Sequence, residues 1–165
     1  MIYFPETAEA KEFLLAWAMK VIGVRHLEQP YPVGFFIGDD ENPRLAAVGI
    51  YHDYRPPSVF LSLASVNPHW ATKKNIQCLY SYAFTPKPVG LGVNRITALC
   101  DKRNKRSRKF IAGVGFKEEG CIRQGGGAGE DLIVYGLLRR ELEVAGKNIS
   151  VEGDVAGLRK KLAHG

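Results

Sequence analysis

Histidine exchanges a proton near neutral pH, which makes His52 and His69 the first residues to consider in this 165-residue sequence. His52 lies in a predicted strand over 44–53 and is followed by Asp53, whose carboxyl group is a second proton acceptor. His69 lies directly after a predicted strand over 58–66, which also contains Ser65. These residue types allow proton transfer at either place, although a surface or loop histidine is the simpler interpretation of each one taken alone.

A compact block of positive charge is the second feature that could carry a function. Its six members fall within eight positions and hold most of the excess behind the net charge of +6: Lys102, Arg103, Lys105, Arg106, Arg108 and Lys109. Such a block can bind nucleic acid, can attract an anionic ligand to the start of a helix, or can be a solvated helix face. The sequence leaves these three interpretations open.

Periodic apolar segments must position these residues. Alternating or continuous apolar stretches predict strands over 1–5, 33–38, 44–53, 58–66, 93–100, 116–123 and 131–139. Apolar residues three and four apart predict helices over 7–22, around 76–84 and after position 104. Thr7 can cap the first of these helices, whose apolar stripe is Ala10, Phe13, Leu14, Trp17 and Val21. Residues 60–66 are mostly apolar on both faces, which indicates a central buried strand.

The composition fits a single domain with one ordinary core, since 45% of the residues are hydrophobic. No apolar run reaches the roughly 20 residues that a membrane span needs, and the acidic N-terminus does not resemble a signal peptide. Three distant cysteines, Cys78, Cys100 and Cys121, lie in apolar elements and are predicted to be buried, reduced thiols. A cytoplasmic protein is expected.

Three runs in the second half of the chain carry a family resemblance: Arg95-Ile96-Thr97-Ala98, Asn104-x-x-Ser107 and Val114-Gly115-Phe116-x-x-Glu119-Gly120-x-x-Arg123. They resemble the GNAT acyl-CoA N-acyltransferases, most closely the branch of ribosomal-protein N-acetyltransferases and phage-borne relatives. Residues 131–139 are similar to that family's closing strand, and the resemblance covers about 66–141. It implies an α/β (α+β) GNAT fold, a mixed central sheet of about six or seven strands flanked by about four helices.

The resemblance implies acetyl-CoA as the acyl donor. In that family the central strand splays from its neighbour and its exposed backbone pairs with the pantetheine arm, which here involves Leu63, Ala64, Ser65 and Val66. Asn104 and Ser107 match positions beside the pantetheine and thioester, although Asn104 also suits helix capping. Phe110 is placed with these cofactor contacts. No metal site is predicted.

Residues 67–74 correspond to the family's pyrophosphate loop. Glycines in that loop usually let backbone N–H groups approach the phosphates, and this chain has none there. Thr72 would then cap the following helix, while Lys73 and Lys74 would supply positive charge.

The implied reaction is direct attack of an amine on the acetyl carbonyl. The amine must first lose a proton, and the candidate bases are His52, Asp53, Ser65 and His69. A backbone N–H of the central strand would stabilise the oxyanion. Phe110 stands where many family members carry a tyrosine as general acid, so either Ser107 or a water would protonate the thiolate, or the thiolate leaves without an acid.

Three functions follow as hypotheses. The first is an N-acetyltransferase acting on a primary amine of an unidentified acceptor. The second is a related enzyme that modifies a DNA base or aminoacyl-tRNA, with the basic block binding the nucleic acid. The third is a non-catalytic or virion-associated binding protein with the same fold. The expected organisation is one domain over 1–141 and a tail over 142–165, with a possible short helix at 154–162, as a monomer or a homodimer.

Overall fold

The alternating apolar segments form a single mixed sheet in the computed structural model, which describes residues 1–144. The sheet has seven strands in the order β1-β2-β3-β4-β5-β7-β6. Their bounds are β1 Ile2–Tyr3, β2 Tyr31–Ile37, β3 Arg44–Arg55, β4 Ser58–Ser65, β5 Arg95–Asp101, β6 Lys117–Ile122 and β7 Leu132–Leu138. The helices are α1 Ala8–Ile22, α2 Lys73–Phe84, α3 Lys105–Gly113 and α4 Arg139–Val144, with a short 3-10 helix, η1, over Pro68–Trp70. The predicted fold class, a mixed sheet with about four helices, is confirmed.

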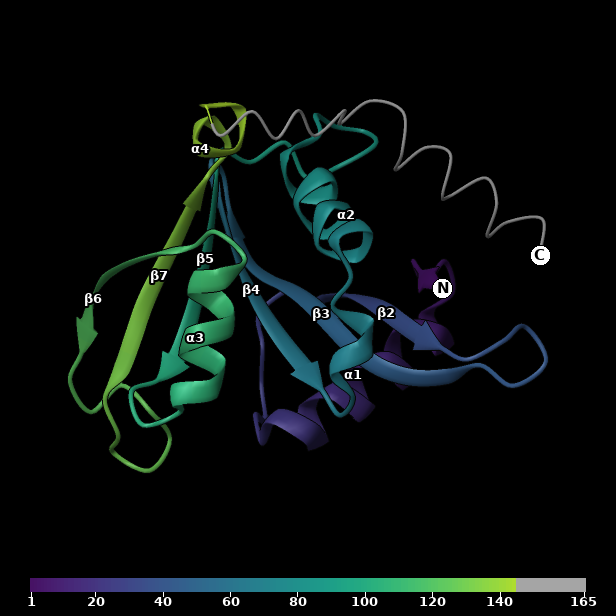
Figure 1. Cartoon of the computed structure of the whole chain (residues 1–165), viewed down its shortest axis with the longest axis horizontal. Helices are drawn as coiled ribbons and strands as arrows, with labels where there is room; N and C mark the ends of the chain where they lie inside the picture. Colours follow the sequence, from purple (N-terminus) through teal and green to yellow (C-terminus); the bar gives the residue numbers. More distant parts are fainter. Residues whose placement is uncertain (145–165) are drawn as a thin grey trace.

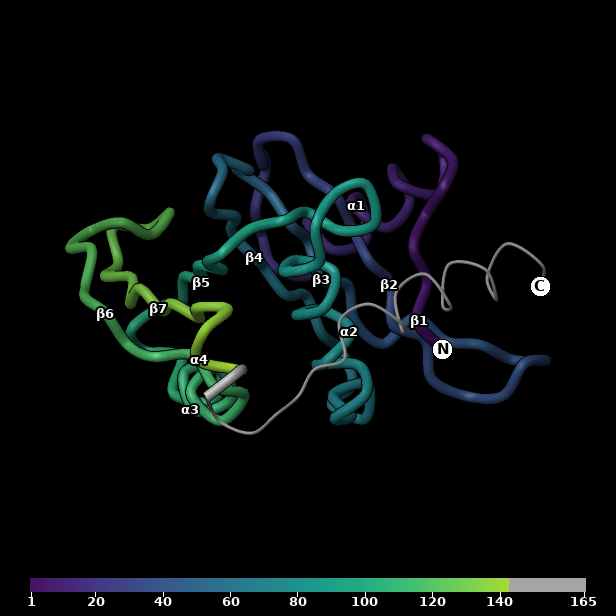
Figure 2. The backbone as a smooth tube through the Cα atoms, turned by 90° about the horizontal axis from the view of Figure 1, so that it is seen from above, coloured from purple at the N-terminus to yellow at the C-terminus, as the bar shows by residue number. Residues whose placement is uncertain are grey.

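The helices divide between the two faces of the sheet. Helix α1 lies behind the sheet in Figure 1, whereas α2 and α3 lie in front of it, and Figure 2 shows the same separation from above. On the α1 face, Leu14 and Ala18 are buried against Val48, Ile50 and Ala64. On the other face a larger core lies under α2 and α3, with Tyr51, Val59, Leu79, Phe84 and Ile96 among its members.

The apolar stripe predicted for the first helix is only partly correct. Leu14 and Ala18 make the buried contact, while Phe13 and Val21 are 61% and 39% exposed. Residues 14 and 18 are four apart and therefore share one helix face, whereas position 13 lies about 100° away from 14. The helix packs along that 14–18 line, which leaves Phe13 in solvent.

Side-chain caps fix the starts of the three longer helices. Thr7 Oγ1 accepts a hydrogen bond from Ala10 N at 3.2 Å, and Thr72 Oγ1 accepts one from Asn75 N at 3.2 Å. Asn104 Oδ1 accepts one from Ser107 N at 3.0 Å. Each bond satisfies a backbone N–H that has no partner within its own helix. The predicted capping roles of Thr7, Thr72 and Asn104 are therefore confirmed.

Strand β2 begins two residues earlier than predicted and contains Pro32. Proline has no N–H to give to a neighbouring strand and so belongs at a free edge. Strand β1 pairs only with Gly34 and Phe35, which leaves Pro32 at the uncovered edge of β2. The predicted strand started at position 33, after Pro32, but a proline at this free edge is compatible with a strand that begins earlier.

Strands β4 and β5 are parallel neighbours that separate soon after they meet. They pair only over Ser58–Phe60 with Arg95–Thr97, although β4 remains paired with β3 as far as Ser65. Figure 1 shows the two strands diverging, with α3 beside β5 and η1 following the end of β4. We call this opening the splay. It divides the sheet into an N-terminal part, β1 to β4, and a C-terminal part, β5 to β7.

The predicted tail over 142–165, with its possible helix at 154–162, lies outside the described residues except for 142–144, which belong to α4. Within residues 1–144, no helix is long and apolar enough to cross a membrane.

Candidate active site

The open edge of β4 presents main-chain hydrogen-bonding groups to the splay. Alternate residues of a strand direct their N–H and C=O groups to opposite sides. Val66 N donates to Ala46 O of β3 at 3.0 Å, whereas Pro57 O accepts from Asn94 N on the β5 side at 2.9 Å. Residues of odd number in β4 therefore face β5, and beyond the last paired position these are Leu61, Leu63 and Ser65.

This parity narrows the predicted pantetheine contacts. Leu63 and Ser65 offer both a donor and an acceptor to the splay. The main-chain groups of Ala64 point toward β3, and Val66 N is already bonded there. Of the four residues predicted from the central strand, two have main-chain groups available to a ligand lying between β4 and β5.

A hydrogen-bonded series of three side chains lies on the α1 face of the same region. His52 Nδ1 is 2.5 Å from Asp53 Oδ2, and His52 Nε2 is 2.8 Å from Ser62 Oγ. The His52 side chain is only 9% exposed, that of Asp53 is 33% exposed, and Ser62 is half-buried. The structure thus brings together two of the predicted proton-transfer residues and adds a serine that the sequence did not single out.

A β-bulge makes the contact between His52 and Asp53 possible. Neighbouring residues of a regular strand point to opposite faces of the sheet. Between His52 and Arg55 the β3–β4 register slips by one residue, and Asp53 adopts a φ of +49°. This left-handed conformation is uncommon for a residue other than glycine, and such residues concentrate at functional sites. A hydrogen bond from Asp53 N to Glu28 O, 2.8 Å long, holds the bulge in place.

An ion pair lies on the same face, beside the positions where β4 and β5 are still paired. Arg95 donates to Glu119 Oε1 at 3.0 Å and to Oε2 at 2.5 Å, and its Nε donates to Thr97 Oγ1 at 2.9 Å. Hydrogen bonding to Arg95 lowers the pKa of the Glu119 carboxyl. Gly136 leaves the room for this pair, because a Cβ there would lie 2.3 Å from Glu119 Oε1. Since Phe60 pairs with both His52 and Thr97, these three side chains form one row across β3, β4 and β5.

The other two predicted bases lie at the far end of β4, apart from this cluster. Ser65 Oγ accepts a hydrogen bond from Trp70 Nε1 at 3.0 Å, which anchors η1 to the strand end. His69 is exposed in η1, and its backbone N–H donates to Asn67 Oδ1 at 3.0 Å. Ser65 lies five positions further along β4 than Phe60, the residue that pairs with His52, and this offset corresponds to roughly 16 Å along a strand.

The start of α2 carries positive charge without any acidic residue. Lys73 and Lys74 are exposed in its first turn, after the Thr72 cap. Positive side chains are unfavourable at a helix N-terminus, where the helix dipole is also positive, unless an anion is present. The arrangement suits a phosphate group even though the preceding loop has no glycine.

Helix α3 closes the opposite side of the splay. Asn104 uses its side-chain oxygen to cap the helix at Ser107 N, so its NH2 group is the part that remains for a ligand. The ring of Phe110 packs against Trp70, with centroids 6.0 Å apart. Because Trp70 follows β4 and Phe110 belongs to α3, this aromatic contact joins the two sides of the splay.

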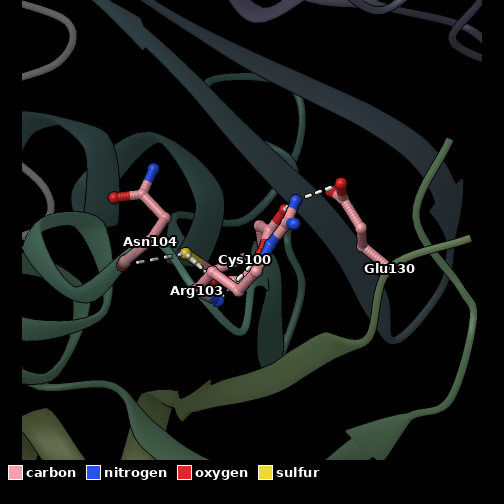
Figure 3. A network of polar contacts seen from close by, with 5 residues as sticks. Cys100, Arg103, Asn104 and Glu130 are labelled. Carbon is pink, nitrogen blue, oxygen red and sulfur yellow. Dashed lines mark hydrogen bonds and ion pairs between the residues drawn. The ribbon is translucent and has the colours of Figure 1, made fainter. Parts of the chain in front are cut away.

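Half of the basic block is paired with carboxylates from β5, β6 and the loop between β6 and β7. Lys102 pairs with Asp131, Arg103 pairs with Asp101 and Glu130, and Arg108 pairs with Glu118. Figure 3 shows Arg103 reaching Glu130, while the Asn104 amide points away from that pair. Hydrogen bonding to Glu130 and to Arg103 lowers the pKa of Asp101 to about 2. The local positive charge is therefore smaller than the sequence indicates.

The prediction of three buried thiols is correct for two of them. Cys78 and Cys100 are buried, and burial raises the pKa of the Cys100 thiol. Cys121 is exposed, because β6 is the edge strand of the sheet and all of its residues are exposed within the part of the chain that the structure describes. Within residues 1–144, no group of three histidine, cysteine or acidic side chains is arranged to hold a metal ion.

Ser62 is the member of the site that sequence reasoning missed. Most of residues 60–66 are apolar, so the sequence pattern indicated only that Ser62 belongs to a buried strand. The signal that identifies it is the pairing of His52 with Phe60, which places the residue two further along β4 within reach of the imidazole.

No protein-family model matches the sequence, and no curated protein matches it either. Solved structures of acetyltransferases do share its fold. A T. thermophilus protein assigned as an acetyltransferase is 20% identical, with a TM-score of 0.62, over 84% of this chain and 72% of that protein. A variant of spermidine N-acetyltransferase SpeG from Vibrio cholerae is 17% identical, with a TM-score of 0.55, over 86% and 81%.

The ribosomal-protein-S5-alanine acetyltransferase of Vibrio fischeri is a third similar structure. It is 19% identical, with a TM-score of 0.52, over 66% of this chain and 61% of that protein. A structure from Bacillus anthracis described as a GNAT-family acetyltransferase is also similar, at 22% identity and a TM-score of 0.50. At these identities the likeness establishes a shared fold, which is that of GNAT acetyltransferases.

Proposed function

We propose that this chain is a GNAT-type N-acyltransferase that transfers an acetyl group from acetyl-CoA to a primary amine. The observation that carries the proposal is the splay, because free main-chain groups at the middle of a sheet need a ligand to pair with them. The shared fold with acetyltransferases supports it. The proposed catalytic domain covers residues 1–141.

The chain's own residues fit an acyl-CoA at three points. Leu63 and Ser65 can exchange hydrogen bonds with the amide groups of a pantetheine arm. Lys73 and Lys74, at the start of α2, can bind the phosphates. When bound, this donor supplies an activated thioester whose carbonyl carbon accepts a nucleophile. We further propose that the Asn104 NH2 group and Ser107 on α3, with Phe110 behind them, contact the thioester end.

His52 is the proposed base, supported by Asp53. Both lie on the face covered by α1, and the bulge at Asp53 holds the carboxylate against the imidazole. An ionised carboxylate only accepts hydrogen bonds, so His52 Nδ1 carries the hydrogen, and Nε2, which lies 2.8 Å from Ser62 Oγ, is the nitrogen that can accept a proton. The N–H of Leu63 points into the splay and can stabilise the oxyanion. Ser65 and His69 are weaker candidates because they lie at the other end of β4.

Calorimetric titration of acetyl-CoA into the purified protein tests the proposal. We expect binding in the micromolar range, together with weaker binding by Asn104→Asp. Aspartate caps a helix as well as asparagine does, so this variant keeps the melting temperature while losing the NH2 donor. Asn104→Ala is the matched comparison, since it loses the cap as well and costs about 1 kcal/mol of stability. Absence of heat with the wild-type protein would overturn the enzyme proposal and favour a binding protein.

A nucleic-acid acceptor is the second candidate and depends on the part of the basic block that forms no ion pair within residues 1–144. Lys105, Arg106 and Lys109 are exposed on one side of α3. Nucleic-acid binding through three such side chains would weaken by a slope of about 3 in log affinity against log salt. Measuring that slope with a short duplex and with tRNA decides whether this surface binds nucleic acid.

A further inference from the structure

The part of the sheet formed by β5, β7 and β6 has one face that no helix covers within residues 1–144. Helix α1 buries Leu14 and Ala18 against residues of β3 and β4. Figures 1 and 2 show this helix behind those strands and away from β6 and β7, while α2 and α3 lie on the opposite face. The α1 side of the C-terminal part of the sheet is therefore molecular surface.

Apolar side chains collect on this surface in two adjacent rows. Leu99 of β5 pairs with Val134 of β7, and Leu132 of β7 pairs with Ile122 of β6. Paired residues share a face, and so do residues two apart on one strand. Leu99 is 41% exposed and Ile122 is 44% exposed, while the other two side chains are half-buried. We call these four residues the apolar patch.

Gly120 leaves the patch open. It pairs with Val134 and so lies in the same row as that residue and Leu99. A Cβ added at Gly120 would meet no atom within 4 Å, and its φ does not lie in the left-handed region. The fold therefore accepts a larger side chain at this position, and such a side chain would extend over the patch.

The patch begins at the edge of the splay. Strands β4 and β5 pair as far as Phe60 with Thr97. Continuing that parallel register by two residues would place Leu99 opposite Ser62, the residue in contact with His52. Leu99 thus lies on the β5 side of the splay and on the face that carries the proposed base. An acceptor amine on its way to that base approaches over this face.

The charged groups that border the patch are engaged with one another. Arg95 binds Glu119 on one side, and Arg103 binds Asp101 and Glu130 on the other. A polyamine needs free carboxylates, and a nucleic acid needs free cations. Because each of these five side chains already has a partner of opposite charge, the border favours an uncharged, apolar segment over either of them.

The patch has the size of a short segment rather than of a subunit. Two rows on three neighbouring strands cover about 10 Å by about 7 Å, on the order of 100 Å². A stable interface between subunits buries about 800 Å² on each partner. The rows lie two and four residues along β5 from Thr97, or about 7 Å and about 13 Å. An extended segment covers these distances in two and four residues, whose side chains point to the same side.

We propose that the acceptor is a polypeptide with an apolar N-terminal segment, which binds in extended form on the apolar patch. Its N-terminal amine lies at the splay, and the side chains of its third and fifth residues contact the two rows. This inference rests on the proposed function for the place of the amine and leaves the transfer step unchanged. What it adds is the class of acceptor and the surface that selects it.

Two peptides of eight residues test the inference on the full chain. One has leucine at its third and fifth positions, the other has asparagine there, and both are otherwise serine and glycine with a free N-terminus. Binding is measured without donor, from the anisotropy of a dye at the C-terminus, and transfer is measured as release of CoA thiol. We expect the leucine peptide to bind about 10–100-fold more tightly, with kcat/KM higher by the same factor, because two leucine side chains leave water.

Gly120→Gln places a polar side chain over the patch. We expect it to weaken binding of the leucine peptide about tenfold and to raise its KM with kcat unchanged, while Tm stays within about 2 °C of the wild type. Gly113→Gln is the matched control, since Gly113 has equally open space but belongs to α3 on the opposite face. The control is expected to bind the peptide as the wild type does. Leu99→Asn is a second variant that should act as Gly120→Gln does.

The outcomes separate this inference from the proposed function. Equal binding of the two peptides, or no effect of Gly120→Gln in a folded protein, overturns the inference. Transfer to spermidine that exceeds transfer to the leucine peptide also overturns it and leaves the acetyltransferase in place. Peptide binding that Gly120→Gln weakens, in a protein that does not bind acetyl-CoA, supports the surface and refutes the donor. A dimer in light scattering that Gly120→Gln dissociates would assign the patch to a second copy of the chain and overturn the inference.

Discussion

Replacing Asp53 by asparagine changes the charge behind His52 while leaving the backbone almost untouched. Asparagine has the shape of aspartate and tolerates a positive φ, so the bulge at +49° is retained. The neutral amide no longer stabilises the imidazolium that forms when His52 takes a proton. Its NH2 group also favours the tautomer in which Nε2 carries the hydrogen and cannot accept another.

The size of the effect follows from the distance between the charges. The contact atoms of His52 and Asp53 are 2.5 Å apart, which places the charge centres at about 4 Å. At an effective dielectric constant of about 20 the interaction is about 4 kcal/mol, or about 10³-fold in rate. Because the Asp53 side chain is 33% exposed, solvent screening reduces this, and we expect Asp53→Asn to lower kcat by about 10²–10³-fold.

Stability is expected to change much less than activity. Weakening one hydrogen bond costs about 1 kcal/mol, which lowers Tm by about 2–4 °C for a chain of this size. Asp53→Gly is the complementary variant. It relieves the left-handed strain, worth about 1–2 kcal/mol, while losing a hydrogen bond of similar size, so its Tm should stay close to that of the wild type.

The assay is release of CoA thiol with an amine acceptor, measured at saturating acetyl-CoA for wild type and both variants, with Tm recorded for each. A loss of two to three decades in kcat in both variants, despite different effects on Tm, assigns the loss to chemistry rather than folding. Retention of kcat within about threefold in either variant would refute the role of the carboxylate, since both remove its charge.

Two further predictions concern stability and acid behaviour. A Cβ on Gly90 would lie 2.5 Å from two backbone carbonyl oxygens, so Gly90→Ala is expected to lower the free energy of unfolding, measured in urea, by about 1–3 kcal/mol. At Gly127 a Cβ would have nothing within 4 Å, so Gly127→Ala should change the free energy of unfolding by less than about 0.5 kcal/mol. Equal effects would contradict the packing around Gly90. Hydrogen bonds to Glu130 and Arg103 lower the pKa of Asp101 to about 2, so its contribution to stability is complete above its ordinary pKa of 3.8 and is lost as the pH falls through about 2. Carbon-13 titration of the Asp101 carboxyl should give this value and a higher one in Arg103→Ala; an ordinary value in the wild type would contradict the ion pairs.

Local sequence patterns were enough to predict the order of the strands and helices. Alternation and apolar runs gave the strands, and Thr7, Thr72 and Asn104 marked the helix starts, because a cap is decided by residues three positions apart. Residue type alone identified His52 and Asp53 as candidate bases. Their direct contact could not be read from the sequence, since adjacent strand residues normally lie on opposite faces and the bulge depends on the β3–β4 register.

Features that depend on distant partners were the ones that sequence reasoning could not supply. Ser62 lies beside His52 only because β4 pairs with β3, a strand that ends before Ser62 in the chain. The charge of the basic block is reduced by carboxylates up to 29 residues away, such as Asp131 beside Lys102. Cys121 is exposed because β6 is the last strand of the sheet, and strand order is a property of the whole fold.

The short pairing between β4 and β5 also has a mechanical consequence. Only three positions on each strand pair β4 with β5, so strand pairing holds the two parts of the sheet together at one end only. Amides in a middle strand normally exchange with solvent slowly, whereas those of Leu63 and Ser65 should exchange as fast as amides at an outer edge. A ligand that fills the splay takes the place of a missing strand segment. It therefore connects the two parts of the sheet, and slower hydrogen exchange at these two amides would report its binding directly.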